Sequence, residues 1–296
     1  MRLNGLIKGF LSVVVGLMAA TVTMAQDGLQ GLETVGKPTP GAMGFQPAAT
    51  ELARDGQWLD GMVLYIITAI TIFVTLLLIW VVIRYNHRAN KTAARFTHHT
   101  MVEILWTVLP IIILIVIGSF SLPILFKQLE IPESDLTVKV TGNQWYWTYE
   151  YPESGVAFDS FMIGAGAPGL TDEVKAELAE YGYSEDEYLL AADTALVVPV
   201  GAVVRVQILA SDVNHSFAVP SFGIKMDAIV GRLNETWFNV EREGVYFGQC
   251  SELCGKNHSY MPIVVKAVSQ EVYDQWLAGA IEEYAEIPAS TQVASN

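Results

Sequence analysis

Residues 250 to 268 read Cys250-Ser-Glu252-Leu-Cys254-Gly-Lys-Asn-His258-Ser-Tyr-Met261-Pro-Ile-Val-Val-Lys-Ala-Val268. The first part of this stretch holds two thiols, an imidazole and a thioether, the soft ligands that copper takes in electron-transfer sites. The part that follows runs apolar with β-branched side chains, which is typical of a strand. The stretch therefore predicts a redox metal held by a loop of a β domain.

The rest of the C-terminal half carries the same strand pattern. Apolar and β-branched residues alternate or run together in three more segments, separated by Gly and Pro: 136–141, 203–209 and 235–240. A period of two along such segments predicts strands with one buried face. We expect an all-β domain over residues 127–285, in the form of a small antiparallel sandwich or barrel.

Two helices are expected within this domain. One belongs to an acidic insertion at about residues 163–190 and spans Leu170 to Gly182, with Thr171 as its N-cap and acidic residues in its first turn. The other spans Ser269 to Tyr284, and we expect Trp276 to pack on the barrel. The Ala- and Ser-rich residues 286–296 are expected to form a flexible tail.

An aromatic strand is expected at residues 144–151. Because successive side chains of a strand point to opposite faces, its residues divide into two sets. One face carries Trp145, Trp147, Tyr149 and Tyr151, and the other Tyr146, Thr148 and Glu150. Most of these rings are expected in the core, but an exposed indole near a redox metal would be a natural entrance for electrons.

The N-terminal part predicts an exported protein. Residues 1–25 have a positive start, an apolar stretch and small residues before Gln26, as a signal peptide does. Residues 26–60 are rich in Gly and Pro and are expected to form an irregular segment on the outer surface.

Two membrane-spanning helices are expected next. Residues 61–83 contain no charge, which gives a helix of about 35 Å, long enough to cross the hydrocarbon core. Residues 104–126 form a second such run, interrupted by Pro110 and Pro123. The connecting loop, 84–103, carries only basic charges up to its last residue, so the positive-inside rule places it in the cytoplasm. Both mature termini and the β domain then lie on the periplasmic side of a bacterial inner membrane.

The loop ends in a carboxylate, Glu103, beside an apolar segment. Such a group caps the helix and complements its dipole, or it forms the mouth of a proton pathway. Its position alone favours the cap.

The β domain is strongly acidic. The chain has a formal net charge of −14, and from Lys127 onward 9 Lys and Arg face 25 Asp and Glu. This balance repels nucleic acid as a partner. It attracts a basic protein by long-range steering, or it serves solubility alone.

Several readings of the two cysteines compete. A disulfide explains neither His258 nor Met261, and zinc has no need of a thioether. A mononuclear blue-copper site uses one thiolate, so a second cysteine is one too many. Two bridging thiolates favour two copper ions, each with one histidine and one weak axial ligand, and His215 is the second histidine of this half of the chain.

The chain resembles subunit II of bacterial heme-copper (aa3-type) cytochrome c oxidases from about Trp58 to Trp276. The resemblance is carried by the hairpin and by four motifs: Gln144-Trp-Tyr-Trp147, Asp212-Val-Asn-His215-Ser-Phe217, Lys225-Met-Asp-Ala-Ile-Val-Gly-Arg232 and the cysteine motif. It implies a cupredoxin-like barrel with the dinuclear copper centre called CuA. The ligands that it implies are His215, Cys250, the backbone carbonyl of Glu252, Cys254, His258 and Met261.

The resemblance implies further roles. Trp145 resembles the residue that takes the electron from cytochrome c, with Glu150 and Asp212 among the acidic docking groups. The side chain of Glu252 resembles a ligand to a magnesium ion shared with the catalytic subunit. Glu103 resembles the carboxylate at the mouth of a proton pathway, whereas its position alone favours a helix cap.

The function implied is that of the electron-accepting subunit of the oxidase. It passes electrons to haem in catalytic subunit I of the complex, where oxygen is reduced to water and protons are translocated. This chain alone has no site for oxygen chemistry.

Three residues depart from the family pattern: Asn143, Phe217 and Val230. Three rivals are a membrane-tethered copper chaperone of thioredoxin-like fold, a copper-free quinol oxidase subunit and a nitrous-oxide reductase. The first lacks the hairpin, the second lacks the ligand set, and the third needs a large further domain.

Overall fold

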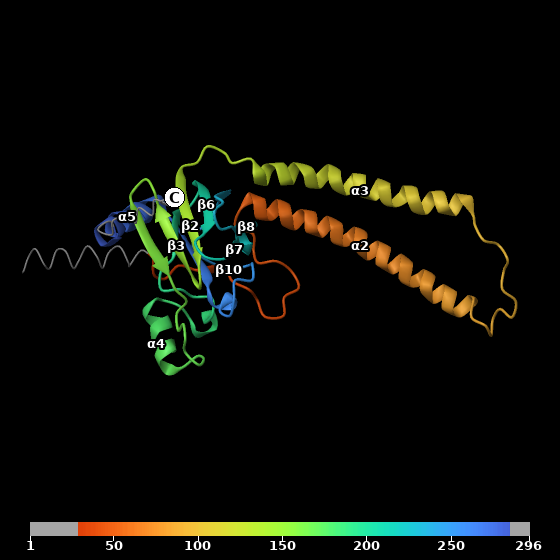
Figure 1. Ribbon diagram of the computed structural model, residues 1–296, viewed down its shortest axis with the longest axis horizontal. Helices are drawn as coiled ribbons and strands as arrows, with labels where there is room; N and C mark the ends of the chain where they lie inside the picture. The colour runs from red at the N-terminus through yellow and green to blue at the C-terminus, as the bar shows by residue number, and fades with distance from the viewer. Residues whose placement is uncertain (1–28, 285–296) are drawn as a thin grey trace, which may run out of the picture. The chain divides into compact units, whose positions relative to one another are not determined.

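The structure is a computed structural model that describes residues 29–284. The expected signal peptide and the expected tail lie outside the described residues. The chain divides into two compact units (Figure 1). A helical unit comprises residues 54–130, and a β unit takes its described residues from both flanks, 29–53 and 131–284.

The helical unit is a pair of long apolar helices, α2 (Glu51–Arg84) and α3 (Thr100–Leu129). Both are long and apolar enough to cross a membrane, and their most apolar windows have no buried residues. An edge-to-face contact of Trp58 with Phe120, at 5.6 Å between ring centroids, and an ion pair of 2.7 Å between Lys127 and Asp55 join the two helices at one end. The apolar faces left exposed along both helices are suited to lipid.

The β unit is a sandwich of two sheets. The first has the strand order β5-β11-β10-β7-β8, with β1 also paired to β10, and the second has the order β4-β3-β2-β6-β9. The bounds in the first sheet are β1 (Thr34–Gly36), β5 (Leu196–Pro199), β7 (His215–Val219), β8 (Ile224–Ala228), β10 (Gly244–Cys250) and β11 (Pro262–Val268). In the second they are β2 (Leu136–Asn143), β3 (Tyr146–Tyr151), β4 (Val156–Ser160), β6 (Val203–Ala210) and β9 (Asn234–Asn239). The expected two-helix hairpin followed by an all-β, cupredoxin-like sandwich is confirmed.

Alternating burial along the second sheet confirms the period of two. In β2 every second side chain from Leu136 to Val140 is buried, and β6 repeats the pattern. Parallel register places Val138 beside Val206 and Val140 beside Ile208, so these inward side chains share one core. Burying each such side chain contributes about 1.5–3 kcal/mol.

The expectation of a purely antiparallel sandwich is wrong. Strands β2 and β6 are parallel, as are β5 and β11, and β1 and β10. In each of these pairs, other elements separate the two partners along the chain. Hydrophobic alternation specifies which face of a strand is buried, but it does not specify the direction of a distant neighbour.

The insertion packs on the outer face of the first sheet. It contains α4 (Asp172–Glu180) and the short helix η1 (Glu185–Glu187). Val174 and Leu178 of α4 form a second core with Phe247 of β10 and Val264 of β11. Strands β10 and β11 are therefore buried on both faces, which explains their nearly continuous apolar sequence. Thr171 is the N-cap of α4 as expected, accepting a hydrogen bond from the backbone N–H of Val174.

The C-terminal helix α5 (Gln270–Tyr284) closes one end of the main core. Its Trp276 lies 5.2 Å from the ring of Tyr151, as ring centroids, so the expected docking of this indole is confirmed. Two further single turns complete the β unit: η2 (Pro220–Phe222) and η3 (His258–Tyr260).

The segment before the hairpin is more regular than expected. Strand β1 pairs with β10, and the hydroxyl of Thr34 donates a hydrogen bond of 2.6 Å to the carboxylate of Glu187 in η1. Helix α2 begins at Glu51, ten residues before the uncharged run. The part of the expected irregular segment that the structure describes is thus partly a strand of the first sheet and partly the first turns of α2.

Candidate metal centre

The candidate metal-binding side chains meet because β7 begins and β10 ends at the same edge of the sandwich. His215 opens β7 and Cys250 closes β10, and these strands are antiparallel neighbours with Cys250 opposite Phe217. The loop after β10 then returns to β11 and carries Cys254, His258 and Met261. From the second sheet, the loop after β6 leads directly into His215.

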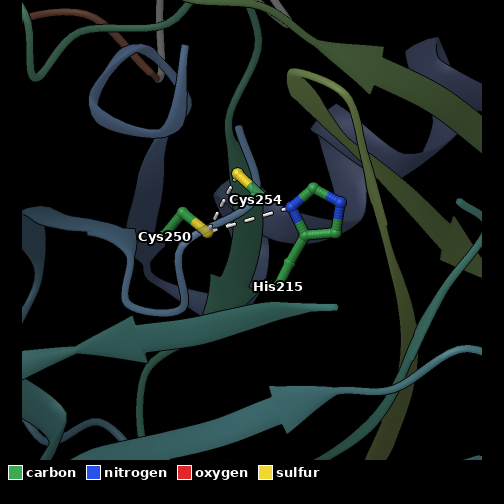
Figure 2. A group of neighbouring side chains, drawn as sticks. All are labelled: His215, Cys250 and Cys254. Atoms are coloured by element: carbon green, nitrogen blue, oxygen red, sulfur yellow. Dashed lines mark hydrogen bonds between the residues drawn. The ribbon is translucent and has the colours of Figure 1, made fainter. Parts of the chain in front are cut away.

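Three of the expected donors form a tight buried group. Figure 2 shows the side chains of His215, Cys250 and Cys254 converging, with their donor atoms within 4.8 Å of one another. The Sγ atoms of the two cysteines are 3.9 Å apart, and Nδ1 of His215 is 3.9 Å from Sγ of Cys250. Both thiols are free, and a disulfide needs sulfurs about 2.05 Å apart. The disulfide reading therefore does not hold in this structure.

The remaining expected donors lie on either side of the sulfur pair. The carbonyl oxygen of Glu252 is 3.3 Å from Sγ of Cys250. On the other side, Sγ of Cys254 is 3.6 Å from Nδ1 of His258 and 3.5 Å from Sδ of Met261. The structure thus brings all six expected donor groups to one place.

The donor set fits a soft metal. The sulfur separation of 3.9 Å is shorter than twice a metal–thiolate bond of about 2.3 Å, so both sulfurs can ligate the same ion. Thiolate, imidazole and thioether donors together select copper over magnesium or calcium. His215 approaches Cys250, and His258 approaches Cys254. Each imidazole can therefore complete a separate metal position, and the two sulfurs lie between these positions.

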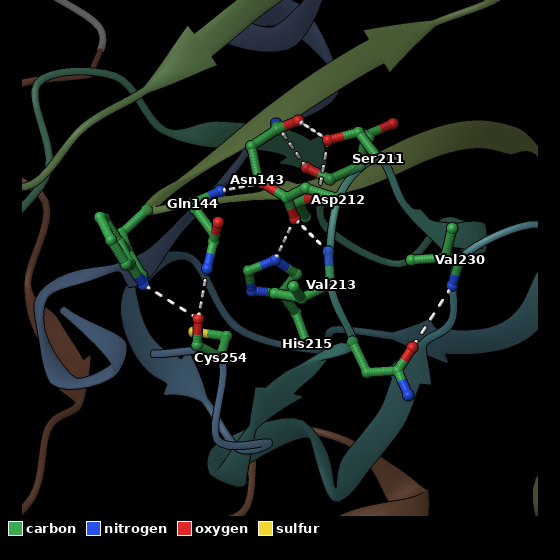
Figure 3. Close-up of polar contacts among 12 residues, drawn as sticks. Asn143, Gln144, Ser211, Asp212, Val213, His215, Val230 and Cys254 are labelled. Atoms are coloured by element: carbon green, nitrogen blue, oxygen red, sulfur yellow. Dashed lines mark hydrogen bonds and ion pairs between the residues drawn. The ribbon is translucent and has the colours of Figure 1, made fainter. Parts of the chain in front are cut away.

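Asp212 orients the buried imidazole of His215. Figure 3 shows its carboxylate between three donors. Oδ1 lies 2.9 Å from Nε2 of His215 and 2.6 Å from the backbone N–H of Val213, and Oδ2 lies 2.7 Å from the backbone N–H of Gln144. Burial raises the pKa of Asp212, but these hydrogen bonds bring it below its ordinary value. An ionised carboxylate only accepts, so Nε2 carries the proton and Nδ1 is left free to bind a metal.

The two thiols differ in acidity. Burial raises the pKa of Cys250, but its hydrogen bonds with His215, with the backbone of Glu252 and Ser216 and with His258 together outweigh burial and lower the pKa to about 7. Burial and the charge of Cys250 raise the pKa of Cys254 to about 12. Burial lowers the pKa of His215, yet its hydrogen bonds with Cys250 and Asp212 raise it overall. Cys250 is therefore the more acidic of the two thiols.

Trp145 lies against the metal loop. Its indole N–H points at the carbonyl oxygen of Cys254, at 3.3 Å, and the side-chain amide of Gln144 donates to the same oxygen at 2.8 Å. Strand β3 begins one residue later, at Tyr146, so Trp145 does not continue the buried face of Trp147, Tyr149 and Tyr151. This indole is half-buried and contacts the backbone of Cys254, one of the candidate metal ligands.

The side chains of the other candidate residues take no part in the donor cluster. Glu150 forms an ion pair of 2.7 Å with Lys139 of the neighbouring strand β2. Glu252 has an exposed side chain that makes no hydrogen bond or ion pair to another described residue. Glu103, in the helical unit, accepts a hydrogen bond of 3.2 Å from the backbone N–H of His99, the N-cap of α3. Its contact is that of a helix cap.

The three departures from the family pattern have ordinary local roles. The amide of Asn143 donates to Thr148 at 3.0 Å, and its carbonyl accepts from the hydroxyl of Ser211. Phe217 is fully buried and contacts the ring of Trp147 edge to face, 5.5 Å away. Val230 has an exposed side chain, and its backbone forms an isolated bridge with Ala210.

Sequence reasoning missed two positioning features. A Cβ at Gly142 would lie 2.9 Å from the imidazole of His215, so only glycine leaves that ring its place. The orienting role of Asp212 was also missed, although a carboxylate three residues before a ligand histidine in a loop is a signal for it. No local signal marks Gln144 or Gly142, whose partners are distant in sequence.

Comparisons with known proteins agree with this architecture. A family model described as the periplasmic domain of cytochrome c oxidase subunit II matches residues 136–268, and one described as its transmembrane domain matches residues 38–124. Cytochrome c oxidase subunit 2 of Cereibacter sphaeroides is 55% identical over 284 residues, which cover 95% of this chain and 93% of the relative. Probable cytochrome c oxidase subunit 2 of Rickettsia bellii is 47% identical over 82% of this chain and 85% of its own length.

Among solved structures, the periplasmic domain of subunit II of cytochrome oxidase from Bradyrhizobium japonicum is 44% identical. The match covers 53% of this chain and 100% of the Bradyrhizobium japonicum chain, with a TM-score of 0.44.

Proposed function

Because the chain belongs to the cytochrome c oxidase subunit II family, we propose that its donor cluster holds a dinuclear CuA centre that takes electrons from cytochrome c. The protein is a membrane component of an oxidase complex, and its Cys/His cluster is consistent with an electron-accepting role. In this proposal the electrons pass on to haem in subunit I, and oxygen is reduced to water there, coupled to proton translocation.

The observation that carries the proposal is the sulfur pair with one imidazole on each side. Cys250 and Cys254 would bridge two copper ions, which His215, His258, Met261 and the carbonyl of Glu252 would complete. When bound, copper would supply one-electron redox chemistry. The protein contributes a rigid, buried set of donors, and such a set limits the rearrangement that accompanies each change of charge.

Trp145 is the proposed entrance for electrons. Its contact with the carbonyl of Cys254 supports this role, because the indole is partly exposed on one side and touches a ligand residue on the other. A basic cytochrome c is the proposed donor, attracted by the acidic β unit. Of the two proposed docking carboxylates, Glu150 is already paired with Lys139, and Asp212 is engaged with His215, so each offers only part of its charge.

Other family roles are proposed for this chain on its family membership. The exposed side chain of Glu252 would bind a magnesium ion at the boundary with subunit I. Glu103 would stand at the mouth of a proton pathway. Its hydrogen bond with the backbone N–H of His99 can be exchanged for one with water, so the cap contact is compatible with this role. The two helices would cross the lipid of a bacterial inner membrane, with the basic loop in the cytoplasm and the copper-binding unit in the periplasm.

The test is copper stoichiometry with electron paramagnetic resonance on the full chain in detergent, expressed without the other subunits. We expect two copper ions per chain and a spectrum in which one unpaired electron is shared equally by both nuclei. In Cys254→Ser we expect that sharing to be lost, because a single thiolate does not bridge two ions in this way. One copper per chain in the wild type, silent in resonance, would instead show a carrier of Cu(I) and overturn the dinuclear proposal.

A further inference from the structure

One lysine of the metal loop lies over the indole of Trp145. The ammonium of Lys256 is 5.7 Å from the ring centroid, within the range of a cation–π interaction. The loop itself is held against the ring, because Gly255 has a φ of +124° and a Cβ there would lie 3.0 Å from Cζ2 of the indole. Lys256 therefore projects from a backbone whose position is fixed on both sides, by Cys254 and by His258.

The indole is the partner of this ammonium. Among residues 29–284, no carboxylate lies within ion-pair distance of Lys256, and its side chain is exposed. An unpaired cation on a ring face keeps its full charge toward any approaching molecule.

The face around Trp145 thus has a positive centre in a negative domain. The β unit as a whole attracts a basic partner from a distance, because it is strongly acidic. At contact, however, the partner meets one cation at the ring through which the electron would pass. Charges within a few ångströms of a docking centre set specificity and orientation more than they set total affinity.

We propose that Lys256 is a specificity-determining residue, which selects electron donors whose exposed redox edge is neutral or acidic at its centre while their rim is basic. This inference rests on the proposed electron-accepting function of Trp145. Lys256 penalises a donor that places its own lysines over the indole, and it stabilises a donor that places a carboxylate or a polar backbone group there. The repulsion between Lys256 and the lysines of the donor also orients the donor. Only one orientation about the docking axis places the non-basic patch of the donor opposite the ammonium of Lys256.

The experiment measures how fast a c-type cytochrome reduces the copper of the intact oxidase complex. The probe is a reduced, strongly basic c-type cytochrome with lysines around its haem edge, mixed by stopped flow at low and at high ionic strength. The variants are Lys256→Gln, Lys256→Glu and Lys256→Arg. Lys175→Gln is the matched control, because it removes one positive charge from helix α4 and not from the metal loop.

We expect Lys256→Gln to raise the second-order rate constant about 2- to 5-fold at low ionic strength and Lys256→Glu to raise it further, because a repulsion at the docking centre is removed and then reversed. Lys256→Arg should behave like the wild type, and Lys175→Gln should raise the rate only slightly or leave it unchanged, because it makes the β unit more acidic at a site away from the metal loop. The differences should disappear at high ionic strength. An unchanged resonance spectrum of the copper in every variant separates these effects from damage to the site.

Equal rates for the wild type and both charge-removing variants at low ionic strength would overturn the role of Lys256. A lower rate in Lys256→Gln would overturn it as well, because the ammonium would then attract the donor. If the copper of the wild type itself accepts no electron from the cytochrome, the proposed function fails instead, so the two failures are distinguishable.

Discussion

Replacing Asp212 by Asn tests whether the metal centre depends on an oriented imidazole. The carboxylate accepts three hydrogen bonds, from Nε2 of His215 and the N–H of Val213 through one oxygen and from the N–H of Gln144 through the other. An amide keeps one acceptor oxygen. If that oxygen serves His215 and Val213, the amide NH₂ faces the N–H of Gln144, and two donors oppose each other.

The magnitude follows from these contacts. A hydrogen bond to a charged group contributes about 1.5–3 kcal/mol, and the variant loses one and weakens two. The side chain of Asp212 is 33% exposed, so water screens part of this loss. We expect the metal-free β unit to be destabilised by about 1–2 kcal/mol. Copper affinity should fall about 10- to 100-fold, as it does when an orienting partner of a metal-bound histidine is removed.

The assay uses the full chain in detergent. Copper affinity is measured by competition with a chelator, followed by the thiolate-to-copper absorption, and stability is measured by urea unfolding followed by tryptophan fluorescence. Asp159→Asn is the control, because it removes the same charge from an exposed carboxylate that contacts Thr148 and not the ligands. Equal losses of affinity in both variants would show that net charge is responsible, and would refute the orientation of His215 by Asp212.

Three further outcomes are expected. Gly142→Ala should reduce copper occupancy and alter the resonance spectrum, because its Cβ would lie 2.9 Å from the imidazole of His215; metal content of the purified chain measures this, and normal occupancy would contradict the fit. Tyr149→Phe should be neutral or stabilising by up to about 1 kcal/mol in urea unfolding, because its buried hydroxyl has no partner among the described residues. Tyr151→Phe should cost about 1–3 kcal/mol, because that hydroxyl bonds both the N–H and the C=O of Val197. Equal effects of the two substitutions would refute this contrast. Lys266→Met should stabilise the β unit by about 1–3 kcal/mol at pH 7, because burial lowers the pKa of this ammonium to about 8. In the wild type the unfolded chain therefore binds more protons between about pH 8 and 10.5, and the free energy of unfolding rises with pH over that range. A variant that keeps this rise would show that Lys266 does not cause it.

Local sequence patterns were sufficient for the long helices, for α4 and α5, for strands β2, β3, β6, β9 and β11, and for the donor loop. The uncharged runs predicted both long helices, and the period of two predicted the strands that carry Val138 and Val206 inward. The donor loop was found because its ligands lie within one short segment. The chemistry of soft donors then predicted copper, independently of the strands around it.

Features that depend on distant partners were not predictable in this way. Parallel pairing of β2 with β6 depends on how the chain crosses between sheets, and β1 is too short to show a pattern. The contact of Gly142 with His215 and the bond from Gln144 to the carbonyl of Cys254 join residues far apart in sequence. Such contacts are set by the packing of two sheets, and periodicity along one strand does not contain that information.

The pairing of β1 with β10 has a consequence for the order in which the protein is made. Thr34 lies opposite Val245, so a strand near the start of the chain waits for a partner synthesised more than two hundred residues later. Both apolar helices are made in the interval. Pairing of such high sequence separation is slow, because the chain must close a very long loop before any contact stabilises it. We therefore expect the β unit to complete its first sheet as a late step of biogenesis, after the hairpin has been synthesised. Residues 29–53 need to stay unpaired and soluble until then.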